Sequence, residues 1–237
     1  MGQTRASAVG QIGASAVGQI GATDRTRARR LPERAAVSTD ALYEVLDSGL
    51  TCHVGFVYDG YPVVIPTAYG RSGERLYLHG STGSRMLRTL AAGTDICITV
   101  TLVDGLVLAR SAFHHSVNYR SAVVFGTATP LEEPEEKLAG LRVIVDHLVP
   151  SRWAQVRPPT PRELAATSVL TVPLTEASVK VRSGPPKDEA EDYALPIWAG
   201  VVPLRLQAGP PQDDPSLAPG VSPYGQVFSR IREKTWP

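Results

Sequence analysis

Two segments of the chain gather side chains that could bind a small molecule, and the first lies between two apolar runs. Residues 108–126 read LARSAFHHSVNYRSAVVFG, with two adjacent histidines, an Asn-Tyr-Arg triplet and three serines. Loops between strands favour Gly, Pro, Asn and Asp, and polar side chains beside a core are costly unless they meet a polar partner. The composition therefore predicts a ligand-lined turn of a β-barrel, with a solvated hairpin shoulder as the structural alternative.

The second segment, residues 80–85, reads GSTGSR and lies between an expected strand and an expected helix. Free backbone N–H groups, several hydroxyls and one guanidinium at such a junction can cradle a phosphate. The segment is not a Walker motif, because the lysine is missing and the glycine spacing is wrong. On residue types alone, an ordinary serine-capped turn explains it more simply.

Strands are the main elements that would position these segments. Val and Ile recur in short runs, which favours strands filled by β-branched residues. The Asp59-Gly60 dipeptide suits a type I′ hairpin turn. The expected strands cover residues 52–58, 62–67, 76–79, 96–102, 106–109, 122–128, 168–182 and 201–206.

Helices are expected only at intervals between the strands. Residues 38–40 offer N-cap side chains for a helix that ends near Gly49. Residues 85–92 form a short helix closed by Gly93, and residues 134–149 form a helix with one apolar face. Strand runs joined by short turns indicate an antiparallel sheet closed on itself, since closure removes exposed edges.

Composition limits the classes of function. The 24 basic and 23 acidic side chains give a formal net charge of +1, so no global field attracts nucleic acid or an anionic membrane. Cys52 and Cys97 lie in separate apolar runs and form neither a disulfide framework nor a metal signature. No apolar run approaches the roughly 20 residues that cross a bilayer. We expect a cytoplasmic protein without nucleic-acid or membrane partners.

The chain divides into one globular domain and two tails. Residues 6–13 read ASAVGQIG and residues 14–21 repeat them letter for letter, without a periodic apolar face to bury. A basic stretch at residues 23–34 is either a solvated arm or one that packs across a dimer. The predicted parts are a disordered repeat tail at 1–24, the domain at 25–206 and a Pro- and Gly-rich tail at 207–237.

Three short sequence blocks, and the order in which they follow one another along the chain, resemble those of a known protein family. They are CHVGF at residues 52–56, LHGSTGSR at residues 78–85 and the polar run at residues 108–126. Together they resemble the pyridoxamine 5′-phosphate oxidase-like flavoproteins, in the branch that includes nitroimidazole-resistance reductases. The resemblance covers about residues 26–204. It implies a mainly β fold, a split β-barrel that binds FMN at a homodimer interface, and it implies little about the substrate.

The resemblance assigns the FMN phosphate to the 80–85 turn. Ser84 and Arg85 match the family's phosphate-binding positions, and Gly80 and Ser81 lie in the same turn. A charge-assisted hydrogen bond contributes about 1.5–3 kcal/mol, so Arg85 is expected to matter for flavin affinity.

The flavin ring is assigned to the end of an earlier strand. In the family this edge, here Thr67, Ala68 and Tyr69, lies along the isoalloxazine ring. Tyr69 is equally well interpreted as an aromatic at the barrel mouth.

Three histidines lie within the candidate segments. His79 precedes the phosphate turn, and the resemblance places it close to the flavin; a core histidine with a satisfied hydrogen bond is the alternative. His114 and His115 are neighbours that would point to opposite faces of a strand, so no metal site is predicted. Asn118 and Arg120 share one face and are further candidate cofactor contacts, with an ion pair as the alternative for Arg120.

Two late blocks are assigned to the partner subunit's flavin. KVRSGPP at residues 180–186 and the segment at residues 193–200 resemble family blocks with which the second subunit completes the flavin pocket. Trp198 is interpreted as an interface anchor or as a wall that stacks on the cofactor, with a core tryptophan as the structural alternative. A second copy of the chain is therefore the expected macromolecular partner.

The expected function is an FMN-dependent oxidoreductase that reduces a small organic acceptor such as a nitro or quinone compound. The flavin ring carries the hydride chemistry, so no catalytic residue is assigned. Oxidation of pyridoxamine phosphate is disfavoured, because the sequence has no second phosphate-binding cluster. The alternatives are a deazaflavin reductase that uses F420 and a non-enzymatic flavin or haem carrier.

Overall fold

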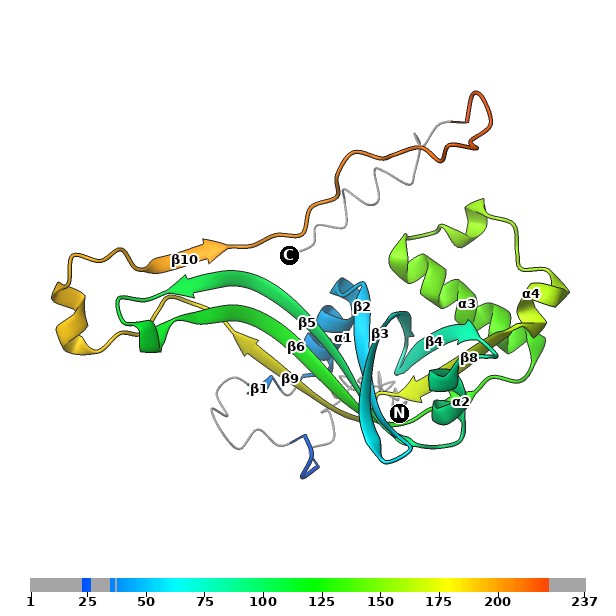
Figure 1. Cartoon of the computed structure of the whole chain (residues 1–237), viewed down its shortest axis with the longest axis horizontal. Coiled ribbons are helices and arrows are strands. Elements are labelled where there is room, and N and C mark those ends of the chain that lie inside the picture. Colours follow the sequence, from blue (N-terminus) through cyan, green and yellow to red (C-terminus); the bar gives the residue numbers. More distant parts are fainter. Residues whose placement is uncertain (1–22, 27–34, 37, 222–237) are drawn as a thin grey trace, which may run out of the picture.

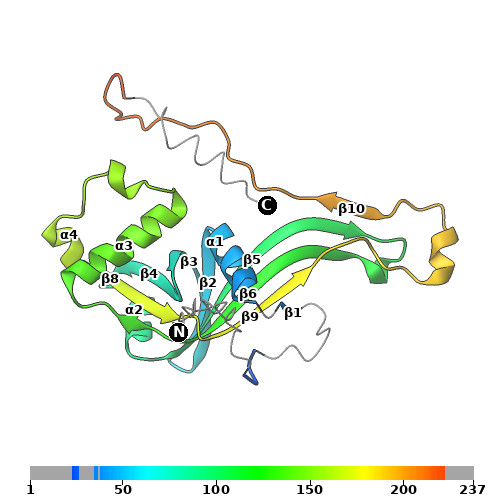
Figure 2. The same cartoon turned by 180° about the vertical axis from the view of Figure 1, so that it is seen from behind.

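The computed structural model describes residues 23–26, 35–36 and 38–221. They form a mainly β fold, a curled antiparallel sheet with the form of a half-barrel and a few short helices (Figures 1 and 2). The strand order is β1-β9-β6-β5-β2-β3-β4-β8-β7, and β10 pairs with β5 off this path. The predicted antiparallel sheet is confirmed, although it curls without pairing its outermost strands in the described part of the chain.

The bounds of the elements are as follows. The strands are β1 (Ala35–Ala36), β2 (Thr51–Tyr58), β3 (Tyr61–Ser72), β4 (Arg75–Ser81), β5 (Asp95–Leu108), β6 (Ser116–Thr127), β7 (Thr129–Pro130), β8 (Thr167–Pro173), β9 (Glu176–Arg182) and β10 (Gly200–Pro203). The α-helices are α1 (Thr39–Ser48), α2 (Arg85–Ala91), α3 (Pro134–Leu148) and α4 (Pro161–Ala165), and the 3-10 helices are η2 (Ala112–His114), η3 (Trp153–Gln155) and η4 (Ala190–Ala194).

The β2–β3 hairpin has the predicted turn. Asp59 and Gly60 have φ angles of 51° and 78°, the positive values that a type I′ turn requires at both central residues. β3 pairs with two strands: its first part pairs with β2, and residues 69–72 pair with β4. This strand therefore links the two halves of the sheet.

The core lies on the inner face of the curled sheet, under α1 and α2. Ser38 caps α1 as predicted, because its hydroxyl accepts from the Ala41 N–H at 3.2 Å. Burying a large aliphatic side chain contributes about 1.5–3 kcal/mol. The cluster includes the buried residues Leu42, Val45, Leu46, Cys52, Val54, Leu87, Leu90, Ile98, Val100 and Val124.

α3 lies directly on the β3–β4–β8 part of the sheet, and glycines permit the close approach. A Cβ atom on Gly70 of β3 would lie 2.8 Å from the Val143 carbonyl oxygen and 2.9 Å from the Ile144 Cα. A Cβ atom on Gly140 of α3 would lie 2.8 Å from the Val169 side chain. Because the contact at Gly70 is with backbone atoms, it fixes the distance between helix and sheet.

β5 and β6 form a long hairpin whose far part extends away from the body as an arm (Figures 1 and 2). We define the arm as residues 103–119 and 181–203. The sequence predicted two strands interrupted at residues 103–105, but β5 is one strand with a β-bulge between Val103 and Gly105. β2 and β10 pair with successive parts of the same edge of β5. The continuous strand carries the arm beyond the body.

Two further predictions differ from the structure. Most of residues 108–126 are strand, and the connection that holds the paired histidines is confined to residues 109–115. The expected single run at residues 168–182 is two strands, β8 and β9, which pair with β4 and β6 respectively. The N-terminal repeat lies outside the described residues, and so do residues 222–237 of the predicted C-terminal tail.

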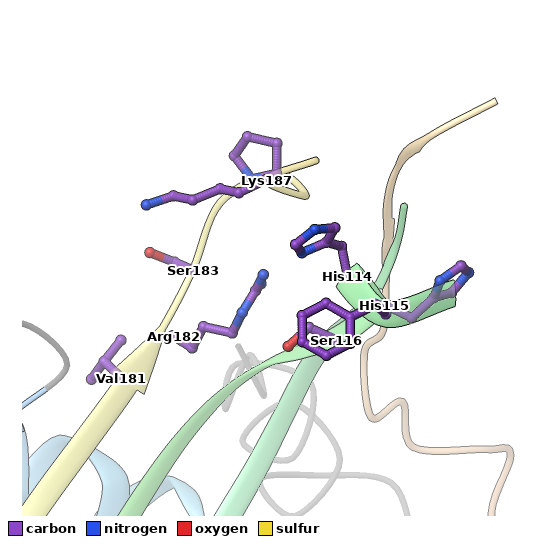
Figure 3. Close-up of a pocket in the computed structure, with 9 residues that line it drawn as sticks. His114, His115, Ser116, Val181, Arg182, Ser183 and Lys187 are labelled. Atoms are coloured by element: carbon purple, nitrogen blue, oxygen red, sulfur yellow. The ribbon is translucent and has the colours of Figure 1, made fainter. Parts of the chain in front are cut away.

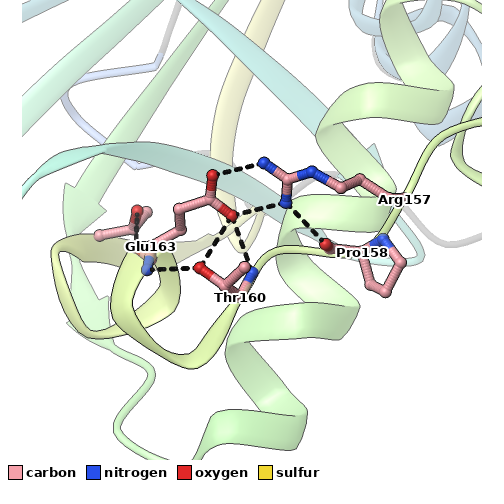
Figure 4. Close-up of polar contacts among 5 residues, drawn as sticks. Arg157, Pro158, Thr160 and Glu163 are labelled. Carbon is pink, nitrogen blue, oxygen red and sulfur yellow. Dashed lines mark hydrogen bonds and ion pairs between the residues drawn. The ribbon is translucent and has the colours of Figure 1, made fainter.

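α4 was not predicted, and it begins with a capping box. The Thr160 hydroxyl accepts from the Glu163 N–H, and the Glu163 carboxylate accepts from the Thr160 N–H. The Arg157 guanidinium donates to both carboxylate oxygens at 2.7 and 2.8 Å (Figure 4). This pairing, with the backbone hydrogen bond, lowers the pKa of Glu163 to about 2. These side chains fix the connection between α3 and β8.

Candidate functional site

The predicted phosphate turn connects β4 to α2, but several of its backbone N–H groups are already bonded. The Thr82 N–H donates to the carbonyl that precedes β8, the Gly83 N–H to the Ser81 hydroxyl and the Ser84 N–H to the Ser81 carbonyl, at 2.9–3.1 Å. Ser84 caps α2, since its hydroxyl accepts from the Leu87 N–H. A phosphate at this turn would be held mainly by side chains, so the expected cradle of free N–H groups is wrong for these three residues.

Arg85 and Ser81 present polar groups at the surface of this turn. Both residues are exposed, and the Arg85 guanidinium lies over the Tyr58 ring, 4.9 Å from its centroid. Gly80 has a packing role instead, because a Cβ atom there would lie 3.0 Å from the Leu87 side chain. The turn thus offers one cation and exposed hydroxyls to an anion.

The predicted ring edge on β3 divides between surface and core. Thr67 and Ala68 are half-buried, whereas Tyr69 is fully buried. The Tyr69 hydroxyl donates to the Leu46 carbonyl at 2.5 Å, and its ring lies 4.7 Å from the His147 ring. Burial raises the pKa of this hydroxyl and keeps it a neutral donor. Tyr69 is 0% exposed and so fits neither interpretation given from the sequence; its ring lies in the core.

His79 is half-buried on β4, one strand position before Gly80. Its Nδ1 atom is buried and has no hydrogen-bond partner among the described residues. Burial lowers its pKa below the ordinary 6.5, so the neutral ring is favoured. A core histidine with a satisfied hydrogen bond was the alternative interpretation of His79, and Nδ1 lacks that hydrogen bond.

This histidine predicts a pH dependence of stability. Because the folded-state pKa is lower than the unfolded-state value, the unfolded chain binds more protons just below pH 6.5, and the free energy of unfolding falls as the pH drops through that range. We expect His79→Gln to reduce this loss of stability between pH 7 and 5, measured by urea unfolding at each pH. His53→Gln, at an exposed histidine of β2, is the control. Equal pH profiles for wild type and His79→Gln would contradict the assignment.

Arg120 and Asn118 make internal contacts. The Arg120 guanidinium donates to both oxygens of Asp104 at 2.9 and 3.1 Å and to Glu44 at 2.9 Å. Asn118 is 8% exposed, accepts from the Arg182 guanidinium and donates to the Gly184 carbonyl. The structure brings Arg120 into the ion pair that the sequence left as its alternative, and it gives Asn118 a role in positioning Arg182.

A pocket of about 390 Å³ lies on the arm, within the roughly 300–1,000 Å³ of known ligand sites (Figure 3). It opens between the η2–β6 segment and the chain that follows β9. Phe113 lines this pocket. The His114 ring and the Arg182 side chain face this space, while the His115 ring is directed away (Figure 3). The remaining lining residues are Ser116, Val181, Ser183, Pro185 and Lys187.

The wall of this pocket is held in place by Asp188. Its carboxylate accepts from the Arg110 and Ser111 N–H groups at 3.0 and 3.3 Å and from the Arg110 guanidinium at 3.1 Å. Arg110 also lies over the Tyr193 ring, 5.0 Å from its centroid. These contacts tie the segment after β9 to the end of β5, so the two sides of the pocket are fixed to each other.

Trp198 lies on the arm, two residues before β10 begins at Gly200. It is 65% exposed, and its ring packs against Gly200, where a Cβ atom would lie 2.9 Å from the indole. Leu106 and Val202, paired across β5 and β10, are also exposed, at 40% and 39%. Because a core tryptophan would be buried, the structure rules out that alternative for this chain in isolation.

Sequence reasoning missed the arm pocket as a unit. The histidines were noted and Arg182 lay in a family block, but Lys187 and Asp188 were not singled out. The two segments are separated by about 65 residues, and the pairing of Tyr119 with Arg182 across β6 and β9 brings them together.

In the described part of the chain, His, Cys, Asp and Glu side chains do not gather in groups of three or more that could hold a metal ion. None of the described helices is both long and apolar enough to span a bilayer.

Comparisons with known proteins agree with this architecture. The flavocytochrome Anf3 from Azotobacter vinelandii is 41% identical; the match covers 88% of this chain and 97% of that one, with a TM-score of 0.83. A FAD and heme binding protein from Mycobacterium smegmatis is 40% identical over 83% of this chain and 97% of that one, with a TM-score of 0.80. A candidate 5-nitroimidazole antibiotic resistance protein from Bacteroides thetaiotaomicron is 24% identical over 62% of this chain and 86% of that one, with a TM-score of 0.53, and shares the fold.

No curated protein matches the chain. The family model described as pyridoxamine 5′-phosphate oxidase matches residues 38–181, which run from α1 through most of β9 and include the phosphate turn and the arm hairpin. This match covers more than half of the sequence, and it agrees with the resemblance in the 52–56, 78–85 and 108–126 blocks. The chain belongs to the pyridoxamine 5′-phosphate oxidase family.

Proposed function

We propose that this protein is a redox protein that binds a flavin and a haem. The observation that carries the proposal is the pair of structures at 41% and 40% identity, which match nearly the whole of their own length and are named as a flavocytochrome and as a FAD and heme binding protein. A bound flavin supplies hydride chemistry at its ring, and a bound haem supplies one-electron chemistry at its iron.

FAD is the flavin that we propose, in place of the FMN expected from the sequence. The support is the naming of FAD for the 40%-identical protein. The phosphate turn fits either flavin, because Arg85 and the exposed hydroxyls of Ser81 and Thr82 can bind the phosphate that FMN carries or the pyrophosphate of FAD. Thr67 and Ala68 on β3 are the proposed contacts of the ring edge.

The identity of the flavin is tested directly. Flavin released from the purified protein by heat is separated by chromatography beside FAD, FMN and F420 standards. We expect FAD; FMN would restore the first expectation, and F420 would support the deazaflavin alternative. An absorption spectrum of the same sample tests for haem through its Soret band.

Reduction of a nitro or quinone compound and a cytoplasmic location stay predictions.

Arg85→Ala is expected to raise the dissociation constant of the flavin at least tenfold. The reason is the loss of one charge-assisted hydrogen bond, which contributes about 1.5–3 kcal/mol. Flavin fluorescence titrated against both proteins measures the change. Arg88→Ala, at an exposed arginine of the same helix, is the matched control and is expected to bind as wild type does. Equal constants for Arg85→Ala and wild type would remove the phosphate from this turn.

The proposed assembly is a homodimer formed through the arm. The support is the exposed apolar surface of Trp198, Leu106 and Val202 on an element that extends away from its own body (Figure 1). Single exposed apolar residues are ordinary on monomers, but a contiguous apolar surface marks an interaction site. A second copy of the chain would bring the same surface to each contact of a two-fold interface.

A further inference from the structure

The lining of the arm pocket contains two cations and no carboxylate. Arg182 and Lys187 are its basic residues, and none of the described residues that line it is acidic. Ser116 and Ser183 add hydroxyl groups to the same lining. Guanidinium, ammonium and hydroxyl groups all donate hydrogen bonds to anions, and a hydrogen bond between ionised groups is stronger than one between neutral groups. The polar part of the pocket therefore suits a small anion.

The two acids that follow Lys187 in the chain do not pair with it. The Asp188 side chain is 0% exposed, and its carboxylate accepts from the Arg110 guanidinium. Glu189 is not part of the lining, and one of its carboxylate oxygens lies 3.5 Å from the His114 Nε2 atom. Lys187 is exposed and forms no ion pair with the described residues. An anion can therefore reach the ammonium group without displacing either acid.

Arg182 is held in position by two neutral groups. Its guanidinium donates to the side-chain oxygen of Asn118 and, at 3.5 Å, to the Gly184 carbonyl. Asn118 is 8% exposed, and its amide donates to the same carbonyl at 3.2 Å. These two partners carry no charge, so they orient the side chain that faces the pocket without cancelling its charge (Figure 3). A cation that is already ordered costs little to order when a ligand binds.

The pocket also has an apolar wall beside its cations. Phe113, Val181 and Pro185 contribute to the lining, and Phe113 is 87% exposed. The Phe113 ring meets the His114 ring edge to face, with 5.2 Å between the ring centroids. Aromatic side chains attract other rings through offset-stacked and edge-to-face contacts. The volume of about 390 Å³ leaves room for a ring beside an anionic group.

We propose that the arm pocket binds small aromatic carboxylates. The carboxylate pairs with Arg182 and Lys187, and the ring of the ligand packs against Phe113. A guanidinium suits this group because it can donate to both carboxylate oxygens at once. The inference goes beyond the proposed function, since it concerns this pocket alone and requires neither the flavin nor the haem.

The test is a titration of benzoate into the full-length protein with its cofactors in place, followed by NMR of the benzoate ring protons at constant ionic strength. We expect Arg182→Gln to raise the benzoate dissociation constant at least about tenfold, because it removes a charge-assisted pair. Lys187→Gln is expected to raise it about twofold to fivefold, since solvent screens this exposed ammonium group. Lys180→Gln is the matched control, because Lys180 is an exposed lysine of β9 that does not line the pocket.

Two further variants keep the test independent of the contacts that Arg182 makes. Ser183 is exposed and lines the pocket, so Ser183→Glu places a carboxylate there without opening the core. We expect this variant to bind benzoate at least about tenfold more weakly, with an unchanged melting temperature. Phe113→Ala is expected to weaken benzoate binding about threefold to tenfold and to leave acetate binding unchanged, because acetate has no ring.

Three outcomes would overturn the proposal. Equal benzoate dissociation constants for wild type, Arg182→Gln and Ser183→Glu would show that benzoate binds elsewhere, and a wild-type protein that binds no benzoate would have no such site. Inorganic phosphate that binds this pocket more tightly than benzoate would assign it to phosphorylated molecules. Flavin that is released in proportion to bound benzoate would make the pocket part of the flavin site, and the flavin part of the proposed function would stand.

Discussion

Gly70→Ala is expected to destabilise the protein strongly, with a loss of 3 kcal/mol or more in the free energy of unfolding. The added methyl group would lie 2.8–2.9 Å from backbone atoms of Val143 and Ile144, closer than real Cβ contacts allow. Overpacking typically costs about 1–3 kcal/mol where side chains can move aside. Here the obstacle is the α3 backbone, so α3 would have to shift away from the sheet and open the contacts around Ile144, which is 1% exposed.

Urea unfolding measures this difference, and Gly55→Ala is the matched control. Gly55 also lies in the sheet, on β2, but a Cβ atom there would lie 3.4 Å from its nearest neighbour, the Cys97 carbonyl. We expect the control to change stability by less than about 1 kcal/mol, because a strand position favours alanine over glycine when space permits. Similar midpoints for Gly70→Ala and wild type would show that the helix adapts to the methyl group.

Local signals allowed much of the fold to be predicted from the sequence. The Asp59-Gly60 turn, the Ser38 cap and the Gly93 closure each depend on a few adjacent residues, and each is found where expected, with Gly93 at a φ of 84°. The α3 prediction also succeeded, because its apolar face recurs over 15 residues. Each of these features depends on residues that are near one another in the sequence. The sequence alone therefore predicts them, without knowledge of the tertiary contacts.

The arm was not visible in the same way. The Val103-Asp104-Gly105 sequence is typical of a turn, yet pairing with β6 continues on both sides of it and turns it into a bulge. Asp104 is held by the Arg120 guanidinium, which lies 16 residues later on the neighbouring strand. Tertiary pairing therefore overrides local turn chemistry at this point, and the predicted pair of short strands becomes one long strand.

The candidate site was predictable in kind and less so in detail. Arg85 and Ser81 are exposed at the predicted turn because that turn is a local structure. Tyr69 and Arg120 are occupied by partners far away in the sequence, Leu46 for the tyrosine and Glu44 for the arginine, so their internal roles follow from the packing of α1. The arm pocket depends on the register of β6 and β9, which composition and periodicity do not specify.

Trp198→Ala is expected to raise the dimer dissociation constant by about 30-fold or more. Truncation of a central tryptophan at an interface commonly costs 2 kcal/mol or more, and a two-fold interface repeats each contact. The indole already packs on Gly200 at one face, so a partner would cover a ring that is held in place rather than a mobile one. If the late segments also complete the partner's flavin site, flavin occupancy is expected to fall as monomer accumulates.

Sedimentation equilibrium measures the association, with flavin occupancy determined on the same samples. Trp153→Ala is the control. Trp153 lies on η3, which directly follows α3, and α3 lies at the opposite end of the molecule from β10 (Figure 1), so the loss of Trp153 should leave the dimer intact. Dimerisation that weakens while flavin occupancy stays complete would separate the interface from the flavin site and assign Trp198 to assembly alone. A wild-type protein that is monomeric and saturated with flavin would refute the dimer itself, because a single chain would then hold the cofactor with the apolar surface of the arm exposed to water.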